Sequence, residues 1–165
     1  ISEIGQRIKK IGDMGKGITD ADLVAIAEAV IGKVPKGKRT LELVNLTVVT
    51  GDRTIPTASL ALIVDGKEVE GSSIGDGPVD AAIRTIKDVV KEFGNVELKE
   101  YRLEAITGGS DAVAEVTVKV TDDRGNLTTA RGVSTDIVMA SVEAMIEAVN
   151  RLFAKRKKEG GKPSG

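Results

Sequence analysis

An internal repeat of about 55 residues limits the folds open to this chain more than any other feature. Four apolar positions in the first copy recur 55 residues later, where Leu41, Leu43, Leu46 and Val48 match Val96, Leu98, Tyr101 and Leu103. In both copies these apolar positions are two residues apart, except that the second and third are three apart. The extra residue predicts a bulge in each strand. A repeat of this size indicates two copies of one supersecondary unit.

Two more strands and a helix follow in each copy. The second strands are expected around the alternating residues 60–64 and 116–120. The turn residues Asp65-Gly66 and 122–125 then lead to third strands over 67–73 and 126–133. Apolar stripes with helical spacing run from 79 to 93 and from 135 to 149, so a helix closes each copy.

We therefore predict an α+β fold of two βββα units, over about 40–94 and 95–154, packed about a pseudo-twofold axis. Residues 1–39 are expected to form a helical linker subdomain, with helical patterns at 2–11 and 19–32. Residues 155–165 are expected to form a flexible basic tail. Because the chain starts at Ile1 rather than Met, we expect it to be a fragment of a longer protein.

The composition excludes most familiar active sites. The chain has no His and no Cys, which argues against zinc sites, Cys nucleophiles, Ser-His systems and disulfides. The net charge of -1 provides no field to attract nucleic acid or an anionic membrane. No apolar run approaches the roughly 20 residues of a membrane span. We expect a cytoplasmic domain without catalytic residues, metal or cofactor of its own.

The most distinctive local motif is Gly75-Asp76-Gly77-Pro78, directly before the first of these helices. Pro78 suits the first helical turn, and the glycines allow a ligand to approach the backbone closely. Free N–H groups at a helix start favour a carboxylate or phosphate. The spacing differs from that of dinucleotide-binding loops. A tight turn without any ligand is the alternative interpretation.

The charges and apolar residues near this motif suit a zwitterion. Asp76, Asp80 and Asp136 could hold an ammonium group while backbone N–H groups hold a carboxylate. An apolar side chain would then need an aliphatic pocket, for which the candidates are Val79, Leu98, Ala105 and Ile137. These residue types together predict a site for a free amino acid.

The equivalent segment of the second copy and the glycine pair Gly108-Gly109 both favour structural roles. Ser134 or Thr135 is expected to cap the second helix, with Asp136 in its first turn. The glycine pair precedes Ser110 at a bend between two strands, where a turn is the simplest interpretation.

Four ordered motifs resemble the C-terminal regulatory domain of 2-isopropylmalate synthases. They lie at 48–58, 75–82, 101–112 and 132–137, and residues 17–23 resemble the small helical subdomain that precedes that domain. The resemblance implies a homodimer that binds leucine near the dimer interface for feedback inhibition. It also implies a parent chain whose metal-dependent TIM barrel condenses acetyl-CoA with 2-oxoisovalerate in leucine biosynthesis.

By the same resemblance, the effector would lie against two groups of residues. The carboxylate and ammonium would lie near Gly75, Asp76, Gly77, Pro78, Val79 and Asp80, and the side chain would contact Leu98, Tyr101, Ala105, Ala112 and Ile137. Citramalate synthases share this domain with isoleucine as effector, so either amino acid fits this interpretation. A dimerisation module without an effector is the remaining alternative.

Overall fold

The computed structural model of the protein describes residues 40–106 and 112–160, without the side chains of 157–160. The expected helices of 1–39 and the bend at Gly108-Gly109 lie outside these residues. The first unit contains β1 (Leu41–Val49), β2 (Thr57–Val64), β3 (Lys67–Ile74) and α3 (Pro78–Val90). The second contains β4 (Val96–Ala105), β5 (Ala114–Asp122), β6 (Leu127–Ser134) and α4 (Ile137–Gly160). The predicted βββα repeat is confirmed.

Each sheet is antiparallel with its strands in chain order, β1-β2-β3 and β4-β5-β6. The two spacings of three are bulges, because the register shifts between Leu43 and Asn45 and between Leu98 and Glu100. Asp65 and Gly66 form the predicted tight turn, both with positive φ, at 49° and 81°. The third strands begin and end within one residue of the predicted positions.

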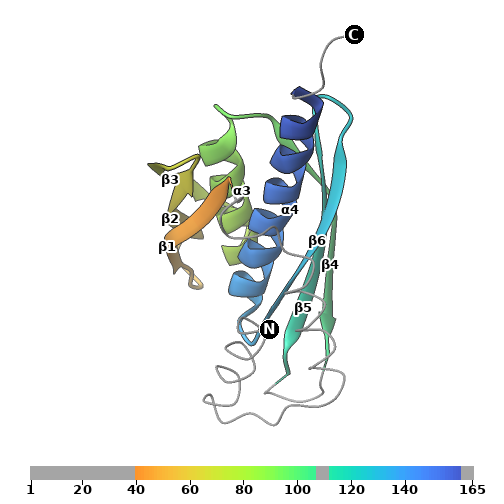
Figure 1. Cartoon of the computed structure of the whole chain (residues 1–165). Helices are drawn as coiled ribbons and strands as arrows, with labels where there is room; N and C mark the ends of the chain where they lie inside the picture. Colours follow the sequence, from red (N-terminus) through yellow and green to blue (C-terminus); the bar gives the residue numbers. More distant parts are fainter. Residues whose placement is uncertain (1–39, 107–111, 161–165) are drawn as a thin grey trace.

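The two helices lie side by side between the two sheets (Figure 1). Helix α3 packs on β2 and β3, and α4 packs on β5 and β6. The contacts also cross between the units, because β1 meets α4 and β4 meets α3. Both helices begin at the lower end in Figure 1, as a twofold axis parallel to them requires. The core is mainly aliphatic, and its largest buried side chains include Leu41, Leu62, Ile86, Met145 and Leu152.

A glycine on the inner face of each third strand brings the helix close to the sheet. Gly71 pairs with Leu60, and Gly132 pairs with Val116, the equivalent residue of the second unit. A Cβ on Gly71 would lie 2.4 Å from Cγ2 of Val89, and one on Gly132 would lie 2.0 Å from the carbonyl oxygen of Ala140. Sequence reasoning did not single out either glycine.

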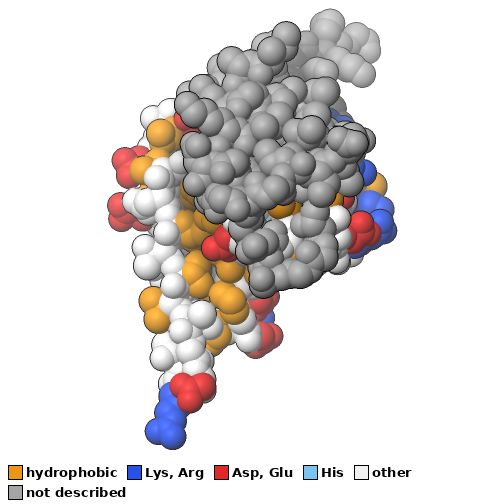
Figure 2. Space-filling model, turned by 90° about the horizontal axis from the view of Figure 1, so that it is seen from below, with side chains coloured by type: hydrophobic (Ala, Val, Ile, Leu, Met, Phe, Trp, Pro, Cys, Tyr) orange, Lys and Arg blue, Asp and Glu red, His pale blue; other side chains and the backbone are white. Residues whose placement is uncertain are grey.

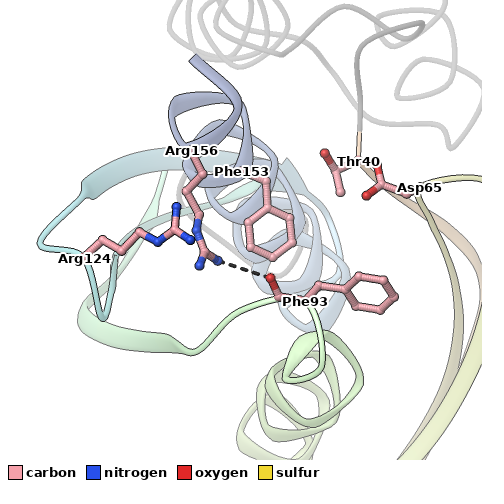
Figure 3. A pocket seen from close by; sticks show the side chains of 6 residues that line it. All are labelled: Thr40, Asp65, Phe93, Arg124, Phe153 and Arg156. Carbon is pink, nitrogen blue, oxygen red and sulfur yellow. Dashed lines mark hydrogen bonds between the residues drawn. The ribbon is translucent and has the colours of Figure 1, made fainter. Parts of the chain in front are cut away.

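Two polar contacts join the units at the C-terminal half of α4. The buried Asn150 amide accepts the Leu41 N–H at 2.7 Å and donates to the Leu41 carbonyl at 3.0 Å. Arg156 donates from Nη1 to the Phe93 carbonyl at 3.2 Å (Figure 3) and lies 3.7 Å from the Asp122 carboxylate.

Helix α4 therefore extends beyond the predicted end of the domain at 154. It continues to Gly160, and Lys155 donates to the Leu127 carbonyl at 2.7 Å. The expected tail is wrong at its start, because Lys155 and Arg156 satisfy acceptors on the fold.

Candidate functional site

The start of α3 carries backbone N–H groups that the described part of the chain leaves open. Gly77 is the N-cap in an extended conformation (φ -165°, ψ 176°), has no side chain to cap the helix, and is followed by Pro78 at the first helical position. The Gly77 carbonyl accepts the Ala81 N–H at 2.9 Å. No acceptor among the described residues faces the N–H groups of Val79 and Asp80. These two groups point out of a positive helix end and can receive an anion.

The backbone N–H groups of Gly75 and Asp76 are bonded within the fold. Gly75 donates its N–H to the Pro56 carbonyl at 3.0 Å, and a Cβ there would lie 2.4 Å from the Ala81 nitrogen. Asp76 donates its N–H to the Asp80 carboxylate at 2.9 Å. Gly75 therefore packs closely against the first turn of α3, and its N–H group and that of Asp76 are already bonded within the fold. The other glycine of the motif, Gly77, has open space where a Cβ would lie.

Two carboxylates and one guanidinium lie beside these open N–H groups. Asp80 Oδ2 lies 2.9 Å from Arg84 Nε, and Asp76 Oδ2 lies 3.6 Å from Arg84 Nη2. The Asp76 side chain is 94% exposed. The cluster has a formal charge of -1 beside a positive helix end, which is the pattern that complements an ammonium and a carboxylate on one small molecule.

The same position in the second unit is filled by a side chain. The Asp136 carboxylate accepts the N–H groups of Val138 at 2.8 Å and Met139 at 3.1 Å. Ser134 Oγ accepts the Asp136 N–H at 3.1 Å. The expected caps Ser134 and Thr135 are wrong, because Asp136 is the N-cap of α4. Its carboxylate takes the place of an external anion.

Ser141, which sequence reasoning missed, forms hydrogen bonds with both Tyr101 and Ile137. Tyr101, on the inner face of β4, shares a 2.7 Å hydrogen bond with Ser141 Oγ of α4. Ser141 also donates to the Ile137 carbonyl at 2.7 Å. Tyr101 is 36% exposed, and Ile137 and Leu103 are exposed beside it in the fold. These residues form an open apolar surface at the end of β4 and the start of α4.

The remaining predicted residues occupy the strand end and the core. Ala105 pairs with Ala114 at the end of β4, and Ala112 precedes β5 at the same end. Val79 and Leu98 pack against the core. Within the described residues, no hydrogen bond or ion pair joins the start of α3 to Tyr101, Ala105 or Ile137.

The starts of α3 and α4 and the end of β4 all lie at the lower end of the molecule in Figure 1. Figure 2 views this end, where hydrophobic side chains reach the surface. A cavity of about 260 Å³ lies instead at the opposite end, where Phe93, Phe153, Arg156 and Arg124 are among the residues that line it (Figure 3). The predicted site residues other than Leu98 thus share one end of the fold, and none of them lines that cavity.

Comparison with known proteins assigns this fold to a family. Residues 17–153 match the family described as the LeuA allosteric (dimerisation) domain. The chain belongs to this family. The LeuA domain described here is 52% identical over 158 residues to "Probable 2-isopropylmalate synthase" of Methanopyrus kandleri, with 95% of this chain and 32% of the relative covered. It is 49% identical over 156 residues to "2-isopropylmalate synthase" of Methanocaldococcus jannaschii, covering 94% and 30% of the two chains.

A third relative carries a different name. The LeuA domain is 46% identical over 166 residues to "Putative (R)-citramalate synthase CimA" of Methanoculleus marisnigri, with 99% of this chain and 32% of the relative covered. The chain spans about a third of the length of these relatives. No helix in the described part of this LeuA domain is long and apolar enough to cross a membrane.

Proposed function

We propose that this LeuA domain binds leucine and mediates feedback inhibition of a 2-isopropylmalate synthase as a homodimer in the cytoplasm. The parent chain would carry the metal-dependent barrel that condenses acetyl-CoA with 2-oxoisovalerate. The observation that carries the proposal is the uncapped start of α3, whose open N–H groups lie beside two aspartates. The relatives named as 2-isopropylmalate synthases support the parent activity.

The geometry suggests how the two charged ends of the effector are held. Its carboxylate would accept hydrogen bonds from the N–H groups of Val79 and Asp80. In α4 the equivalent N–H groups donate to the Asp136 carboxylate. The ammonium of the effector would pair with Asp76, whose carboxylate makes only a long contact to Arg84. Hydrogen bonds between charged and oriented groups of this kind are the stronger ones in proteins.

The effector side chain would lie on the apolar surface of Tyr101, Ile137, Ala105 and Ala112. Val79, in the first turn of α3, and Leu98, near the start of β4, would be further contacts. Because no described polar contact joins this surface to the start of α3, the two parts would complete one site across the homodimer. A subunit contact that brings both parts together would couple effector binding to dimer geometry.

Calorimetry with leucine tests the proposal. Saturation at 100 times the dissociation constant should raise the free energy of unfolding by about 2.7 kcal/mol. Asp76→Asn should weaken binding about tenfold, since it removes one charge-assisted contact worth about 1.4 kcal/mol. Glu104→Gln, which changes an exposed carboxylate on the outer face of β4, is the matched control and should bind as the wild type does. Absence of heat and of thermal shift in a dimeric sample would refute leucine binding.

A second candidate is an isoleucine-sensing domain of an (R)-citramalate synthase, which the relative from Methanoculleus marisnigri favours. Leucine and isoleucine differ in the position of one methyl group, so an apolar pocket separates them by about 1–3 kcal/mol, or about 10- to 200-fold. The ratio of the two dissociation constants decides between the candidates. A dimer that binds neither amino acid would be a dimerisation module alone.

A further inference from the structure

The sequence contains two Asp-Gly dipeptides, Asp65-Gly66 and Asp76-Gly77, and no Asn-Gly. In such a dipeptide the backbone nitrogen of the glycine can attack the side-chain carboxyl carbon, because glycine has no Cβ to hinder the approach. The two dipeptides have the same residue types, so a difference in their reactivity comes from the fold. They provide an internal comparison within one chain.

Three features leave Asp76-Gly77 open to this reaction. The Asp76 side chain is 94% exposed, and its only ion pair among the described residues is a 3.6 Å contact with Arg84. An exposed contact of this length restrains a side chain little. The Gly77 N–H has no acceptor in the described part of the chain. Nothing lies within 4 Å of the Cβ position of Gly77, so the nitrogen has room to move.

The other dipeptide is held by backbone pairing in the first hairpin. Asp65 and Gly66 form a two-residue turn with positive φ at both residues, and the flanking Val64 and Lys67 pair with each other. Asp65 also donates its N–H to the Thr40 carbonyl at 2.9 Å. Closing a ring between the carboxyl carbon and the next nitrogen must rotate the backbone of the aspartate. This turn cannot rotate without disrupting the hairpin.

We propose that Asp76-Gly77 is a site of spontaneous isoaspartate formation at the start of α3. The Gly77 nitrogen forms a bond to Cγ of the protonated Asp76 carboxyl, and its hydrogen leaves with the carboxyl hydroxyl as water. The product is a cyclic succinimide. Water then adds to the main-chain carbonyl carbon of Asp76 and breaks the bond from that carbon to the Gly77 nitrogen. The water taken up balances the water released, and no oxidant or cofactor takes part.

Isomerisation changes the candidate effector site without changing its charge. The main chain between Asp76 and Gly77 gains one methylene group, and the free carboxylate becomes attached directly to the Asp76 Cα. The open N–H groups that follow Gly77 therefore shift relative to this carboxylate. This consequence, unlike the reaction itself, rests on the proposed function. We expect the modified domain to bind leucine about tenfold more weakly, since the ammonium loses its contact.

Incubation of the full chain in oxygen-18 water tests the site, since each hydrolysis of the succinimide inserts one solvent oxygen. Digestion with trypsin follows in ordinary water. Cleavage after Arg53, Lys67 and Arg84 places the two dipeptides in separate peptides, 54–67 and 68–84. Mass spectrometry measures the label in each peptide, and fragmentation of the second peptide distinguishes Asp76 from Asp80.

We expect the label to accumulate at Asp76 and to stay near background at Asp65. Gly77→Ala should keep the melting temperature of the wild type and lower the labelling rate at Asp76 roughly tenfold, because its Cβ hinders the nitrogen. Asp76→Asn is the positive control, since its amide forms the same succinimide with release of ammonia. Equal labelling at Asp65 and Asp76 would overturn the proposal. So would a Gly77→Ala variant labelled as fast as the wild type, or a folded Asp76→Asn variant that stays unlabelled.

Calorimetry on fresh and aged protein tests the consequence for the effector. Protein that carries the isoaspartate should bind leucine more weakly than fresh protein of the same preparation. Equal binding by the two samples would overturn the expected effect on the site. Absence of leucine binding in fresh protein would refute the proposed function instead, and the modification would be judged by the label alone.

Discussion

Replacing Gly132 with Ala adds one methyl group where the backbone of α4 crosses β6. The ideal Cβ position lies 2.0 Å from the Ala140 carbonyl oxygen and 2.7 Å from the Ala144 nitrogen. Gly132 is not among the described glycines with positive φ, so alanine meets no backbone strain there. The whole effect of the substitution is therefore the collision with the helix.

The size of the effect follows from these distances. To restore an ordinary contact of 3.4 Å, the helix must withdraw by about 1.4 Å at Ala140. A gap of about 1 Å already removes up to half of the dispersion attraction between packed surfaces, and α4 carries the buried Ala140, Ala144 and Ala148 on this side. Overpacking by one methyl group costs about 1–3 kcal/mol where side chains can adjust. Because the added methyl group collides with backbone atoms, we expect the free energy of unfolding to fall by about 3 kcal/mol or more.

Urea unfolding measures this loss, and a melting temperature lower by about 10 °C should accompany it. Gly71→Ala is a graded comparison, since its Cβ meets the Val89 side chain at 2.4 Å, which can rotate. We expect about 1 kcal/mol for it. Gly77→Ala is the control, because nothing lies within 4 Å of its Cβ. If Gly132→Ala lowers the free energy of unfolding by less than Gly71→Ala does, the close approach of α4 to β6 is wrong.

Three further perturbations test other features. Asp136→Ala should lower the free energy of unfolding by about 1 kcal/mol and speed amide hydrogen exchange at Val138 and Met139. Asp136→Asn should keep most of the cap. Equal exchange in the two variants would refute the role of Asp136 as the N-cap. Asn150→Ala should cost about 3 kcal/mol in urea unfolding, since it leaves the buried Leu41 N–H and carbonyl without partners. Burial opposes ionisation of Asp122, but hydrogen bonds from Asn126 and the Arg124 N–H, with the charge of Arg156, hold its pKa below the ordinary 3.8. Its contribution to stability is therefore present above about pH 4 and lost as the pH falls through the folded pKa, so stability measured from pH 7 to pH 2 should fall more in the wild type than in Asp122→Asn.

The repeat and its irregularity were readable from the sequence because they depend on local side-chain alternation. The spacing of three between Leu43 and Leu46 leaves one residue without a place in the alternation of the strand, independently of the rest of the fold. The bulge is present there. The turn at Asp65-Gly66 was equally local, since the dipeptide suits two residues with positive φ.

The pairing of Gly71 with Gly132 could not be read in the same way. The two glycines are 61 residues apart, whereas the first strands repeat at 55, because the turn at 122–125 is longer than Asp65-Gly66. An alignment at a constant offset therefore separates them. Their common role depends on which face of the third strand meets a helix, and this is a property of the packed structure.

The sequence identifies the residue types of the candidate site, whereas the backbone groups that stay open there depend on packing. The motif at Gly75 to Pro78 does lie at a helix start, but which N–H groups remain open depends on the Asp76–Asp80 hydrogen bond and on the approach of Gly75 to Ala81. The Asp136 cap was missed because Ser134, Thr135 and Asp136 are all good N-cap residues. Sequence alone does not choose among three adjacent residues of this kind.

The contact of Asn150 with Leu41 also has a consequence for the order of folding. The two residues are 109 positions apart, so the first strand of the fold is completed by its last helix. Contacts of such long sequence separation form late and slow the folding of a chain. During synthesis β1 would have its strand neighbour long before it has Asn150, and the first unit would wait for the second to leave the ribosome. The two units, although repeats of one another, should therefore unfold and refold as a single cooperative body.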